Sequence, residues 1–367
     1  MSISDSLKIL TGLTTLDLSQ NYINKNDVIC LAPALKDLTK LESLDLSTNS
    51  IGPDGIKTLA PYLKDLTGLT YLNLSQNCID VGSTSLALAL KDLTRLRSLN
   101  LADGCIREVG MTDLALVMTD LTGLTYLNLA SNNIRGAGTS LALALTRLTG
   151  LIYLDLSWNW IWEAGIESLA ISLRQLTCLQ SLNLSGINNG GNEYGHVMLS
   201  FCPAIKDLRG ITSLNISCNS YRDAEIACLA MTLRELTGLK SLDLSRTSYK
   251  CIHLITKDMT GLESLNLSGN WFGDAEITYL AIVLQDLTGI QSLHLSDIYI
   301  YGIQKENLSI LSLPHAIKYF TRLHQKLLRP RRHPSAPRKD FDKIYNHVRR
   351  LSFGSLQDRR RFAIEWM

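Results

Sequence analysis

The sequence predicts an α/β repeat solenoid, curved like a horseshoe, with a parallel β-sheet on its concave face and α-helices on its convex face. Three observations predict it. A motif close to L-x-x-L-x-L-S-x-N occurs eleven times, most copies begin 27 or 28 residues apart, and within a copy the apolar spacing changes from two to three and four. Such a period indicates one supersecondary unit stacked on copies of itself. The copies begin at Leu13, Leu41, Leu69, Leu96, Leu124, Leu151, Leu179, Ile211, Leu239, Leu262 and Ile290.

One copy, residues 41–68, shows why each part is expected to adopt its structure. Leu44 and Leu46 are two positions apart and therefore point to one face of a short strand. Asn49 follows where the chain must turn, because its side chain can bond to nearby backbone groups. Residues 52–55, with two glycines and a proline, are predicted to continue the turn. A helix is then predicted from the apolar spacing of Ile56, Leu59, Ala60 and Leu63.

A single copy cannot bury its apolar strand and helix faces, whereas stacking buries both. A helix is wider than a strand, so the stack is expected to curve with the sheet on the inside. These motifs resemble the leucine-rich repeat family, and the 27/28-residue spacing with a full helix resembles its ribonuclease-inhibitor-like class. The resemblance covers about residues 10–302.

The chain beyond the repeats is predicted to be a helical C-terminal extension. An end repeat needs its exposed core covered, and apolar residues at helical spacing follow the last copy. We therefore predict five segments: an N-terminal cap at residues 1–12, the solenoid of about 11 repeats at 13–302, a capping helix at 303–328, a basic proline-rich linker at 329–338 and a basic amphipathic segment at 339–367.

Charge is divided unevenly along the chain. From Lys318 onward there are 14 Lys and Arg against 4 Asp and Glu, whereas the preceding residues carry 22 basic and 30 acidic groups. The basic segment is predicted to fold back on the solenoid or to contact an anionic membrane or an acidic protein. Nucleic acid is disfavoured, because the acidic solenoid would repel a phosphate backbone. The tail residues proposed to make such contacts are Lys343, Arg349, Arg350, Arg359, Arg360 and Arg361.

The composition favours a monomeric cytoplasmic protein. No apolar run has the length of a membrane span, and the first residues lack the features of a secretory signal peptide. The eight cysteines are interpreted as reduced, because no flanking cysteine caps occur and those within repeats replace Ser, Asn, Gly or Thr of other copies. This interpretation applies to Cys78, Cys105, Cys178 and Cys228.

Two copies depart from the regular length. The seventh is four residues longer than usual, and we expect a looser loop at residues 188–192. The ninth is five residues shorter and cannot hold a full turn and helix, so we expect a break in helix packing near residues 251–257. Either irregularity is a convex-side length change or a partner-specific feature.

Aromatic residues stand where the repeat pattern asks for small polar ones. On the open face of the sheet, three tyrosines replace Ser or Thr, and the turn of the sixth copy carries three tryptophans around Ile161. Exposed aromatic clusters are common anchors of protein recognition. Alternatively, these side chains pack on each other or beneath a neighbouring loop. The predicted partner-binding residues are Tyr71, Tyr126, Tyr153, Trp158, Trp160, Trp162 and, in the tenth copy, Trp271.

The sequence lacks phosphate-binding, dinucleotide-binding and zinc-protease motifs, so no catalytic residue, metal or cofactor is predicted. The resembled family includes an activator of the GTPase Ran, inhibitors, sensing regions of NOD-like receptors and bacterial effectors, but none of their functional residues can be matched to this chain. We therefore predict a non-enzymatic, regulatory or scaffolding module that binds a protein partner through its concave face and aromatic rim. A GTPase-activating accessory protein and a membrane-tethered scaffold are the alternatives.

Overall fold

The structure, a computed structural model, describes residues 3–187, 197–247 and 249–300. The chain divides into two compact units, Met1–Leu239 and Lys240–Met367. None of the helices among the described residues is long and apolar enough to cross a membrane.

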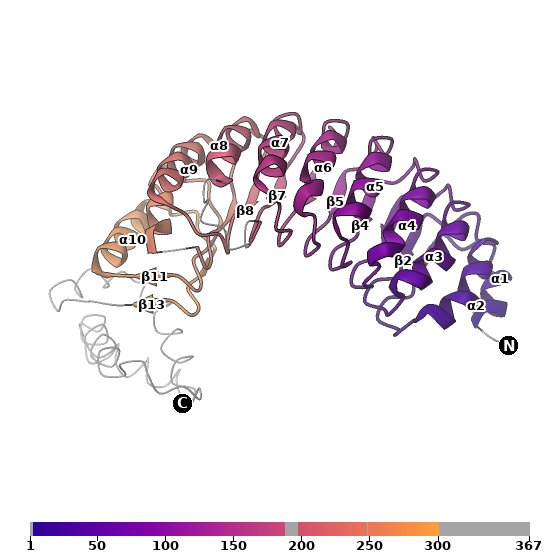
Figure 1. Cartoon of the computed structure of the whole chain (residues 1–367). Coiled ribbons are helices and arrows are strands. Elements are labelled where there is room, and N and C mark those ends of the chain that lie inside the picture. The colour runs from indigo at the N-terminus through magenta and orange to yellow at the C-terminus, as the bar shows by residue number, and fades with distance from the viewer. Residues whose placement is uncertain (1–2, 188–196, 248, 301–367) are drawn as a thin grey trace, which may run out of the picture. The chain divides into compact units, whose positions relative to one another are not determined.

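The first unit is a stack of strand-and-helix repeats that traces an arc, with the strands toward its inner side and the helices along its outer side (Figure 1). Neighbouring strands pair in parallel in sequence order. The strands are β1 (Thr15–Asp17), β2 (Ser43–Asp45), β3 (Tyr71–Asn73), β4 (Ser98–Asn100), β5 (Tyr126–Asn128), β6 (Tyr153–Asp155), β7 (Ser181–Asn183) and β8 (Ser213–Asn215). The helices are α1 (Ile3–Lys8), α2 (Lys25–Leu35), α3 (Gly52–Leu63), α4 (Ser83–Leu90), α5 (Glu108–Met118), α6 (Gly138–Leu145), α7 (Glu163–Leu173), α8 (Val197–Asp207) and α9 (Asp223–Glu235), with 3-10 turns η1 (Asp80–Gly82) and η2 (Arg135–Ala137).

The predicted solenoid fold is confirmed in its register and burial. Each strand pairs with the same motif position of the next copy, so Leu44 lies beside Leu72 and Leu72 beside Leu99. All three leucines are fully buried beneath the helices. The prediction of a turn at residues 52–55 was wrong, because α3 already begins at Gly52. Pro53 lies in the first helical turn, where its missing N–H costs no hydrogen bond.

Each strand is short because its last side chain turns back on the chain. In β2, Oδ1 of Asp45 accepts the backbone N–H of Ser47 at 2.9 Å. In β3, Oδ1 of Asn73 accepts the N–H of Ser75 at 3.1 Å. The side chain replaces a ladder partner and ends the strand after three residues. The same bond to the residue two positions later forms at Asp17, Asn100, Asn128, Asp155, Asn183, Asn215, Asp243 and Asn266.

A buried asparagine then joins each repeat to the one before it. Asn132 is only 3% exposed, and its Nδ2 donates to the carbonyl of Leu101 in the preceding repeat at 2.9 Å. The same nitrogen donates to Leu129 and Ala130 in its own repeat, while Oδ1 accepts the N–H of Ile106 at 2.9 Å. One amide therefore satisfies backbone groups that the turn leaves buried without a ladder partner.

This arrangement recurs at the other buried asparagines of the motif. A donor bond to the preceding repeat is made by Asn49, Asn77, Asn159 and Asn219 in the first unit and by Asn270 in the second. In the ninth copy Thr247 stands at this position. Its Oγ1 donates to Leu244 in its own repeat at 2.7 Å and contacts the next asparagine, Asn270. The asparagines form a continuous ladder only where consecutive copies carry them.

The second unit contains strands β9 (Ser241–Asp243), β10 (Ser264–Asn266) and β12 (Ser292–His294), which pair in parallel. Helix α10 spans Asp274–Asp286, and a separate two-stranded parallel ladder joins β11 (Trp271–Phe272) to β13 (Tyr299–Ile300). In the short ninth copy, the 3-10 segment η3 (Tyr249–Leu254) takes the place of a full helix. The prediction that this copy cannot hold one is confirmed. The long loop expected in the seventh copy lies outside the described residues.

We predict that Asn132→Ala lowers the free energy of unfolding by about 3 kcal/mol, because three carbonyls and one N–H lose a buried partner. Urea denaturation followed by circular dichroism measures the change. The matched control is Asn133→Ala at the adjacent, half-buried position, which should change stability by less than about 0.5 kcal/mol. Equal losses for the two variants would contradict the ladder's role.

Candidate functional site

The three predicted tyrosines occupy one column on the open face of the sheet, which is the face opposite the helices. The register brings Tyr126 beside Tyr153 on adjacent strands. Their rings stack with centroids 4.3 Å apart and planes 6° from parallel. Tyr71 lies two strands from Tyr126, with Ser98 between them. All three tyrosines are half-buried, so each keeps part of its ring open to solvent.

Two of these tyrosines donate to aspartates of the neighbouring column. The hydroxyl of Tyr71 donates to Oδ2 of Asp45 at 3.2 Å, and the hydroxyl of Tyr153 donates to Oδ2 of Asp155 at 3.3 Å. The same oxygens accept Nδ2 of Asn73 at 2.9 Å and of Asn183 at 2.8 Å. Asp45 is thus held by two donors of β3, and Asp155 by one donor of β6 and one of β7, and these bonds fix the tyrosine orientation.

Burial and charge make these tyrosines hard to ionise. Burial raises the pKa of Tyr153 above its ordinary value, and the negative charge of Asp155 and the neighbouring Tyr126 raise it further. The pKa of Tyr71 is also raised, first by burial and then by Asp45. Both hydroxyls therefore stay protonated and remain hydrogen-bond donors.

The sixth-copy tryptophans project from an unusual backbone. Trp158 and Trp160 have φ of 57° and 51°, in the left-handed region that bulky residues rarely adopt. The position of Trp158 has positive φ in most copies, including Gln20, Gln76 and Gly186. The turn therefore demands this conformation whatever the side chain. As a result the tryptophans point out of the repeat, and Trp158, Trp160 and Trp162 are 39%, 44% and 56% exposed.

Trp158 and Trp162 also have local support. A Cβ built on Gly186 of the next repeat would lie 2.8–3.0 Å from the ring of Trp158, so the ring rests on that glycine. On the other side, a Cβ on Gly136 of the preceding repeat would lie 3.1 Å from the ring of Trp162. Among the described residues, the three indoles make no ring contact with one another. The sequence offered packing beneath a neighbouring loop as an alternative to exposure. The structure shows both, because the rings of Trp158 and Trp162 contact neighbouring turns and remain partly exposed to solvent.

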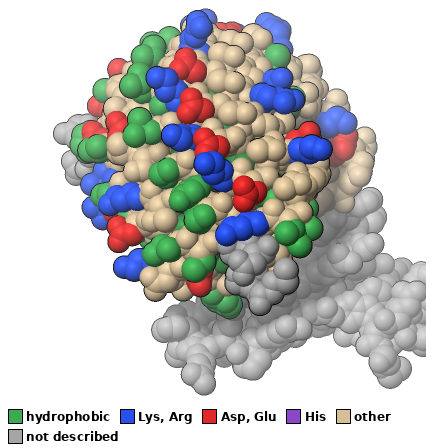
Figure 2. Space-filling model, turned by 90° about the vertical axis from the view of Figure 1, so that its right-hand side faces the viewer, with side chains coloured by type: hydrophobic (Ala, Val, Ile, Leu, Met, Phe, Trp, Pro, Cys, Tyr) green, Lys and Arg blue, Asp and Glu red, His purple; other side chains and the backbone are tan. Residues whose placement is uncertain are grey.

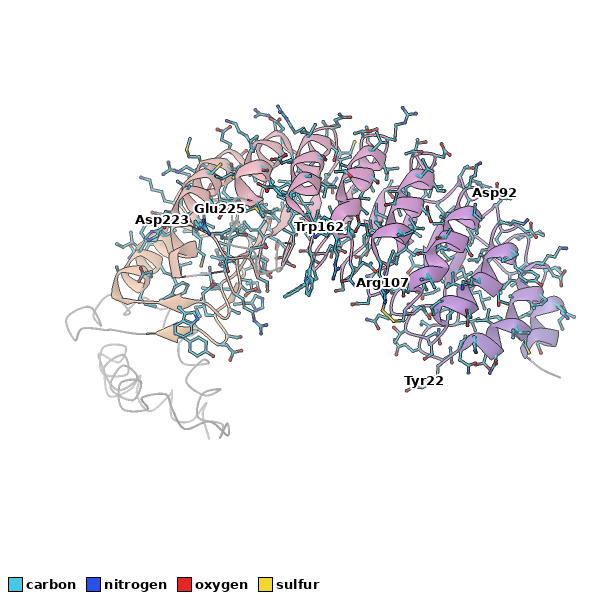
Figure 3. All side chains as sticks on the ribbon, viewed as in Figure 1. Tyr22, Asp92, Arg107, Trp162, Asp223 and Glu225 are labelled. Carbon is cyan, nitrogen blue, oxygen red and sulfur yellow. A yellow bond between two sulfur atoms is a disulfide. The ribbon has the colours of Figure 1, made fainter. Side chains whose placement is uncertain are left out.

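Buried Ile161 anchors this turn. Its Cγ2 would meet a Cβ at either Gly138 or Gly165 at less than 3 Å, and the backbones at these two glycines approach each other closely. The α6 and α7 helices can therefore close over Ile161 only because both positions lack a side chain. Figure 3 shows Trp162 at the inner edge of the first unit, along with Arg107 and Tyr22, whereas Asp92 lies on its outer side.

The second unit has its own aromatic pair, at the motif position that Trp160 occupies in the sixth copy. Trp271 stacks on Tyr299 with centroids 4.8 Å apart and planes 23° from parallel. Both are more than half exposed, while Phe272 beside them is fully buried. Sequence reasoning missed Tyr299, although it stands one copy after Trp271 at the same motif position.

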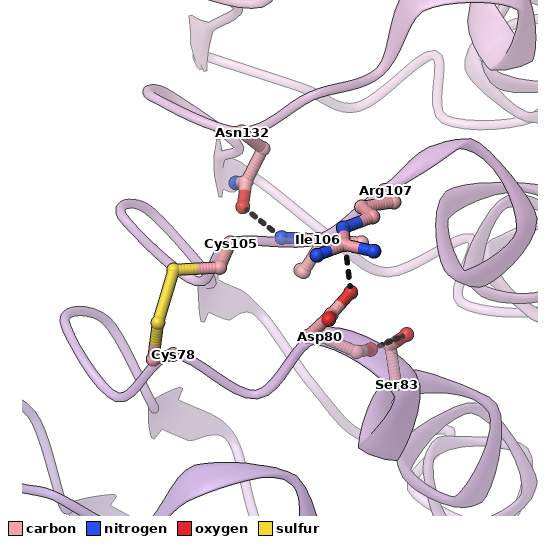
Figure 4. Close-up of polar contacts among 7 residues, drawn as sticks. All are labelled: Cys78, Asp80, Ser83, Cys105, Ile106, Arg107 and Asn132. Atoms are coloured by element: carbon pink, nitrogen blue, oxygen red, sulfur yellow. Dashed lines mark hydrogen bonds and ion pairs between the residues drawn. A yellow bond between two sulfur atoms is a disulfide. The ribbon is translucent and has the colours of Figure 1, made fainter.

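The prediction that the repeat cysteines are all reduced was wrong for one pair. Cys78 and Cys105 form a disulfide with Cα atoms 4.9 Å apart (Figure 4). They occupy the same motif position as Trp160 in consecutive repeats, so stacking alone brings them within bonding reach. Arg107, next to this bond, lies 3.4 Å from the carboxylate of Asp80. The expected cytoplasmic location was based partly on reduced cysteines, and this disulfide removes that argument.

The outward strand positions of the first unit carry charge of one sign. Along β1–β8 the charged residues at these positions are Asp17, Asp45 and Asp155, and no Lys, Arg or His occurs there. The turns that follow carry both signs, with Asp103 and Arg107 after β4 and Arg135 after β5. The side of the molecule seen in Figure 2 differs, because acidic, basic and apolar side chains are interspersed there. The outer helices also expose single aliphatic residues such as Leu116 and Leu143.

Other predicted residues are not placed by the structure. The tail positions Lys343, Arg349, Arg350, Arg359, Arg360 and Arg361 lie outside the described residues. Within the described ranges, no group of three or more His, Cys, Asp or Glu side chains is arranged to hold a metal ion.

Parallel three-residue strands, turns at a fixed position and a buried asparagine ladder define a repeat solenoid. The family model described as Leucine Rich repeat matches four segments, residues 37–60, 121–141, 148–170 and 259–280. These four segments are leucine-rich repeats, and the same motif with its parallel strand recurs in the copies between them.

Solved structures of bacterial proteins resemble the chain. An internalin from Listeria monocytogenes is 23% identical, with 84% of this chain and 86% of that chain covered and a TM-score of 0.47. A leucine-rich repeat protein of Leptospira interrogans is 18% identical, with 89% and 97% covered and a TM-score of 0.42. A search of curated proteins finds no match.

We predict that Tyr153 ionises above the ordinary tyrosine pKa of 10.0 and that Asp155→Asn lowers its pKa without restoring the ordinary value, because burial remains. The difference in tyrosinate absorbance between the wild type and Tyr153→Phe isolates this group. Since the folded pKa is raised, the contribution of Tyr153 to stability should be complete below pH 10 and be lost as the pH rises further. An unchanged titration in the Asp155→Asn variant would show that the carboxylate does not act on Tyr153.

We also predict that reducing the Cys78–Cys105 bond lowers the free energy of unfolding by about 3.5 kcal/mol, the loop-entropy value for a separation of 27 residues. Denaturation with and without dithiothreitol measures this. The Cys78→Ser, Cys105→Ser double variant should match the reduced protein and be insensitive to the reductant. Mass spectrometry of the alkylated, unreduced protein should find these two cysteines linked, and finding both alkylated would contradict the bond.

Proposed function

We propose that the chain is a non-enzymatic module, regulatory or scaffolding in role, that binds a protein partner through its open sheet face and aromatic rim. Leucine-rich repeat proteins generally mediate protein–protein interactions. The observation that carries the proposal here is the sixth repeat, where Trp158 and Trp160 are exposed on a left-handed turn whose backbone also recurs in copies that bear small or polar residues. The fold does not require indoles there.

The energetics of association favour such a rim. Binding orders flexible side chains at a cost of about 0.5–1.5 kcal/mol each, and a preformed surface avoids part of this cost. Trp158 rests on Gly186, and Trp162 rests against Gly136, so both rings are supported before a partner arrives. The stacked pair Tyr126 and Tyr153 lies in the strands that precede these turns. Rigid, partly exposed aromatics of this kind supply most of the binding energy at many interfaces.

The remaining functional expectations from the sequence stay predictions. They comprise the cytoplasmic location, the monomeric state and the contact of residues 339–367 with an anionic membrane or an acidic protein. GTPase activation would require a surface group that reaches a nucleotide bound to the partner. A hydrolysis assay with small GTPases distinguishes that function from simple binding.

We predict that replacing Trp158 by Gln and Trp160 by Ser weakens partner binding about 30-fold or more, the loss expected when hot-spot side chains worth about 2 kcal/mol are removed. Gln stands at the equivalent of Trp158 in two copies with φ near 58°, so the fold should tolerate that change. Ser stands at the equivalent of Trp160 in the second copy with a φ that is not positive, so thermal unfolding is used to check that change. Affinity capture with mass spectrometry identifies partners, and calorimetry then compares the affinities.

The matched control is Leu116→Gln, which removes a 70%-exposed apolar side chain from the outer side of α5. A genuine partner should be retained by the wild type and by this control and lost with the tryptophan variant. Thermal unfolding of all three proteins verifies that they are folded. If the tryptophan variant is folded and holds every partner with unchanged affinity, the rim is not the binding surface.

A further inference from the structure

The tyrosines of the open face stand above a surface of small side chains. In the first unit, the other copies carry Ser or Thr at their position. Tyr126 and Tyr153 stack face to face, which leaves the outer face of each ring free of the other. An aromatic face attracts cations through its negative electrostatic potential.

Strand order places a third tyrosine near this stack. Tyr71, Ser98, Tyr126 and Tyr153 follow one another on consecutive strands. Strands are about 4.8 Å apart, so Tyr71 and Tyr126 are separated by roughly 10 Å at the backbone. The two side chains interact electrostatically, because Tyr126 contributes to the raised pKa of Tyr71, after the larger effects of burial and Asp45. A flat group placed over Ser98 would therefore have a tyrosine on each side.

Negative charge surrounds the same tyrosines. Asp45 is half-buried beside Tyr71, Asp155 is buried beside Tyr153, and the more distant Asp17 and Asp103 are exposed. No basic residue at the outward positions of β1–β8 neutralises them. Because hydrogen bonds from Asn73 and Asn183 fix Asp45 and Asp155, their charge keeps its position. A cationic ligand would therefore meet a negative electrostatic potential whose carboxylates are already held in place before it binds.

The geometry points to an arginine-rich, extended segment of a partner protein as the occupant of this face. This inference rests on the proposed function and specifies the chemistry of the partner. Arginine suits the surface better than lysine, because its planar guanidinium can stack on a tyrosine ring while its N–H groups reach a carboxylate. Lysine offers the same charge without the flat shape.

The spacing of the anionic positions sets the spacing expected in the partner. Asp45 and Asp155 stand at the ends of β2 and β6, which are four strand steps or about 19 Å apart. An extended chain rises about 3.3 Å per residue, so basic residues roughly six positions apart could reach both ends. The tyrosine stack lies between them, next to Asp155.

The test uses the full-length protein and three fluorescein-labelled peptides, nona-arginine, nona-lysine and nona-glutamate, in fluorescence polarisation at physiological salt. Nona-arginine should bind about fivefold more tightly than nona-lysine, as expected for cation–π contacts of up to about 1 kcal/mol. Nona-glutamate should not bind. Tyr126→Ser with Tyr153→Ser, which installs the residue common in this column, should remove the arginine preference and leave nona-lysine binding nearly unchanged.

Charge is tested separately. Asp17→Asn with Asp103→Asn, at two exposed positions, should weaken both cationic peptides by a similar factor of about three, while Leu116→Gln should change neither. Equal affinities for the arginine and lysine peptides, or a preference that survives in the tyrosine variant, would overturn the inference. If nona-arginine binds only after Arg359, Arg360 and Arg361 are replaced by Ser, the face is occupied by the chain's own basic segment and a partner is not its occupant.

The two proposals can fail independently. If nona-arginine does not compete with a captured partner that requires Trp158 and Trp160, the proposed function stands and the arginine-rich assignment falls. If nona-arginine binds as described but no partner depends on the tryptophans, the rim proposal falls. Thermal unfolding of every variant ensures that lost binding is not lost folding.

Discussion

The buried asparagine amide is the interaction on which the rest of this structure depends. Short strands and tight turns leave backbone carbonyls and N–H groups inside the stack without ladder partners, and an unpaired buried group costs about 1–3 kcal/mol. Asn132 satisfies four such groups at once, and Asn49 five, and each ties its repeat to the one before it. The position just before this asparagine is left-handed in copies with and without it, so the turn itself imposes that backbone. Side chains at that position point outward, whatever their size.

The candidate surface follows from this constraint. The turn imposes its left-handed backbone at the Trp158 position in copies with very different side chains, so an indole there is presented outward as a glutamine is. The glycines at Gly186 and Gly136 leave room for the rings to rest on adjacent repeats. On the sheet, strand termination by aspartate likewise places carboxylates beside the tyrosines. Structural bonds and recognition chemistry therefore share the same residues.

Several features could be predicted from one repeat at a time, and others could not. The strand at Leu44, the helix around Leu59 and the missing helix of the ninth copy follow from local spacing, because periodicity is a property of the chain itself. The Cys78–Cys105 bond and the Trp271–Tyr299 stack join different copies. Their signal was in the sequence, since each pair shares a motif position one repeat apart. It becomes visible only when equivalent positions of consecutive copies are considered as spatial neighbours, because a comparison of one copy with another shows only which residues replace each other.

The sequence by itself determined the repeat, its length, the buried leucines and the unusual aromatic residues of the sixth copy. These depend on apolar spacing and on residues that each turn must contain. Only the tertiary structure decided which of those residues meet. The parallel register placed Tyr126 on Tyr153, the stacking brought two cysteines within bonding reach, and the hydrogen bonds of Asp45 and Asp155 tied their charge to the tyrosines. Contacts between repeats depend on register and curvature, which arise only when the copies are stacked.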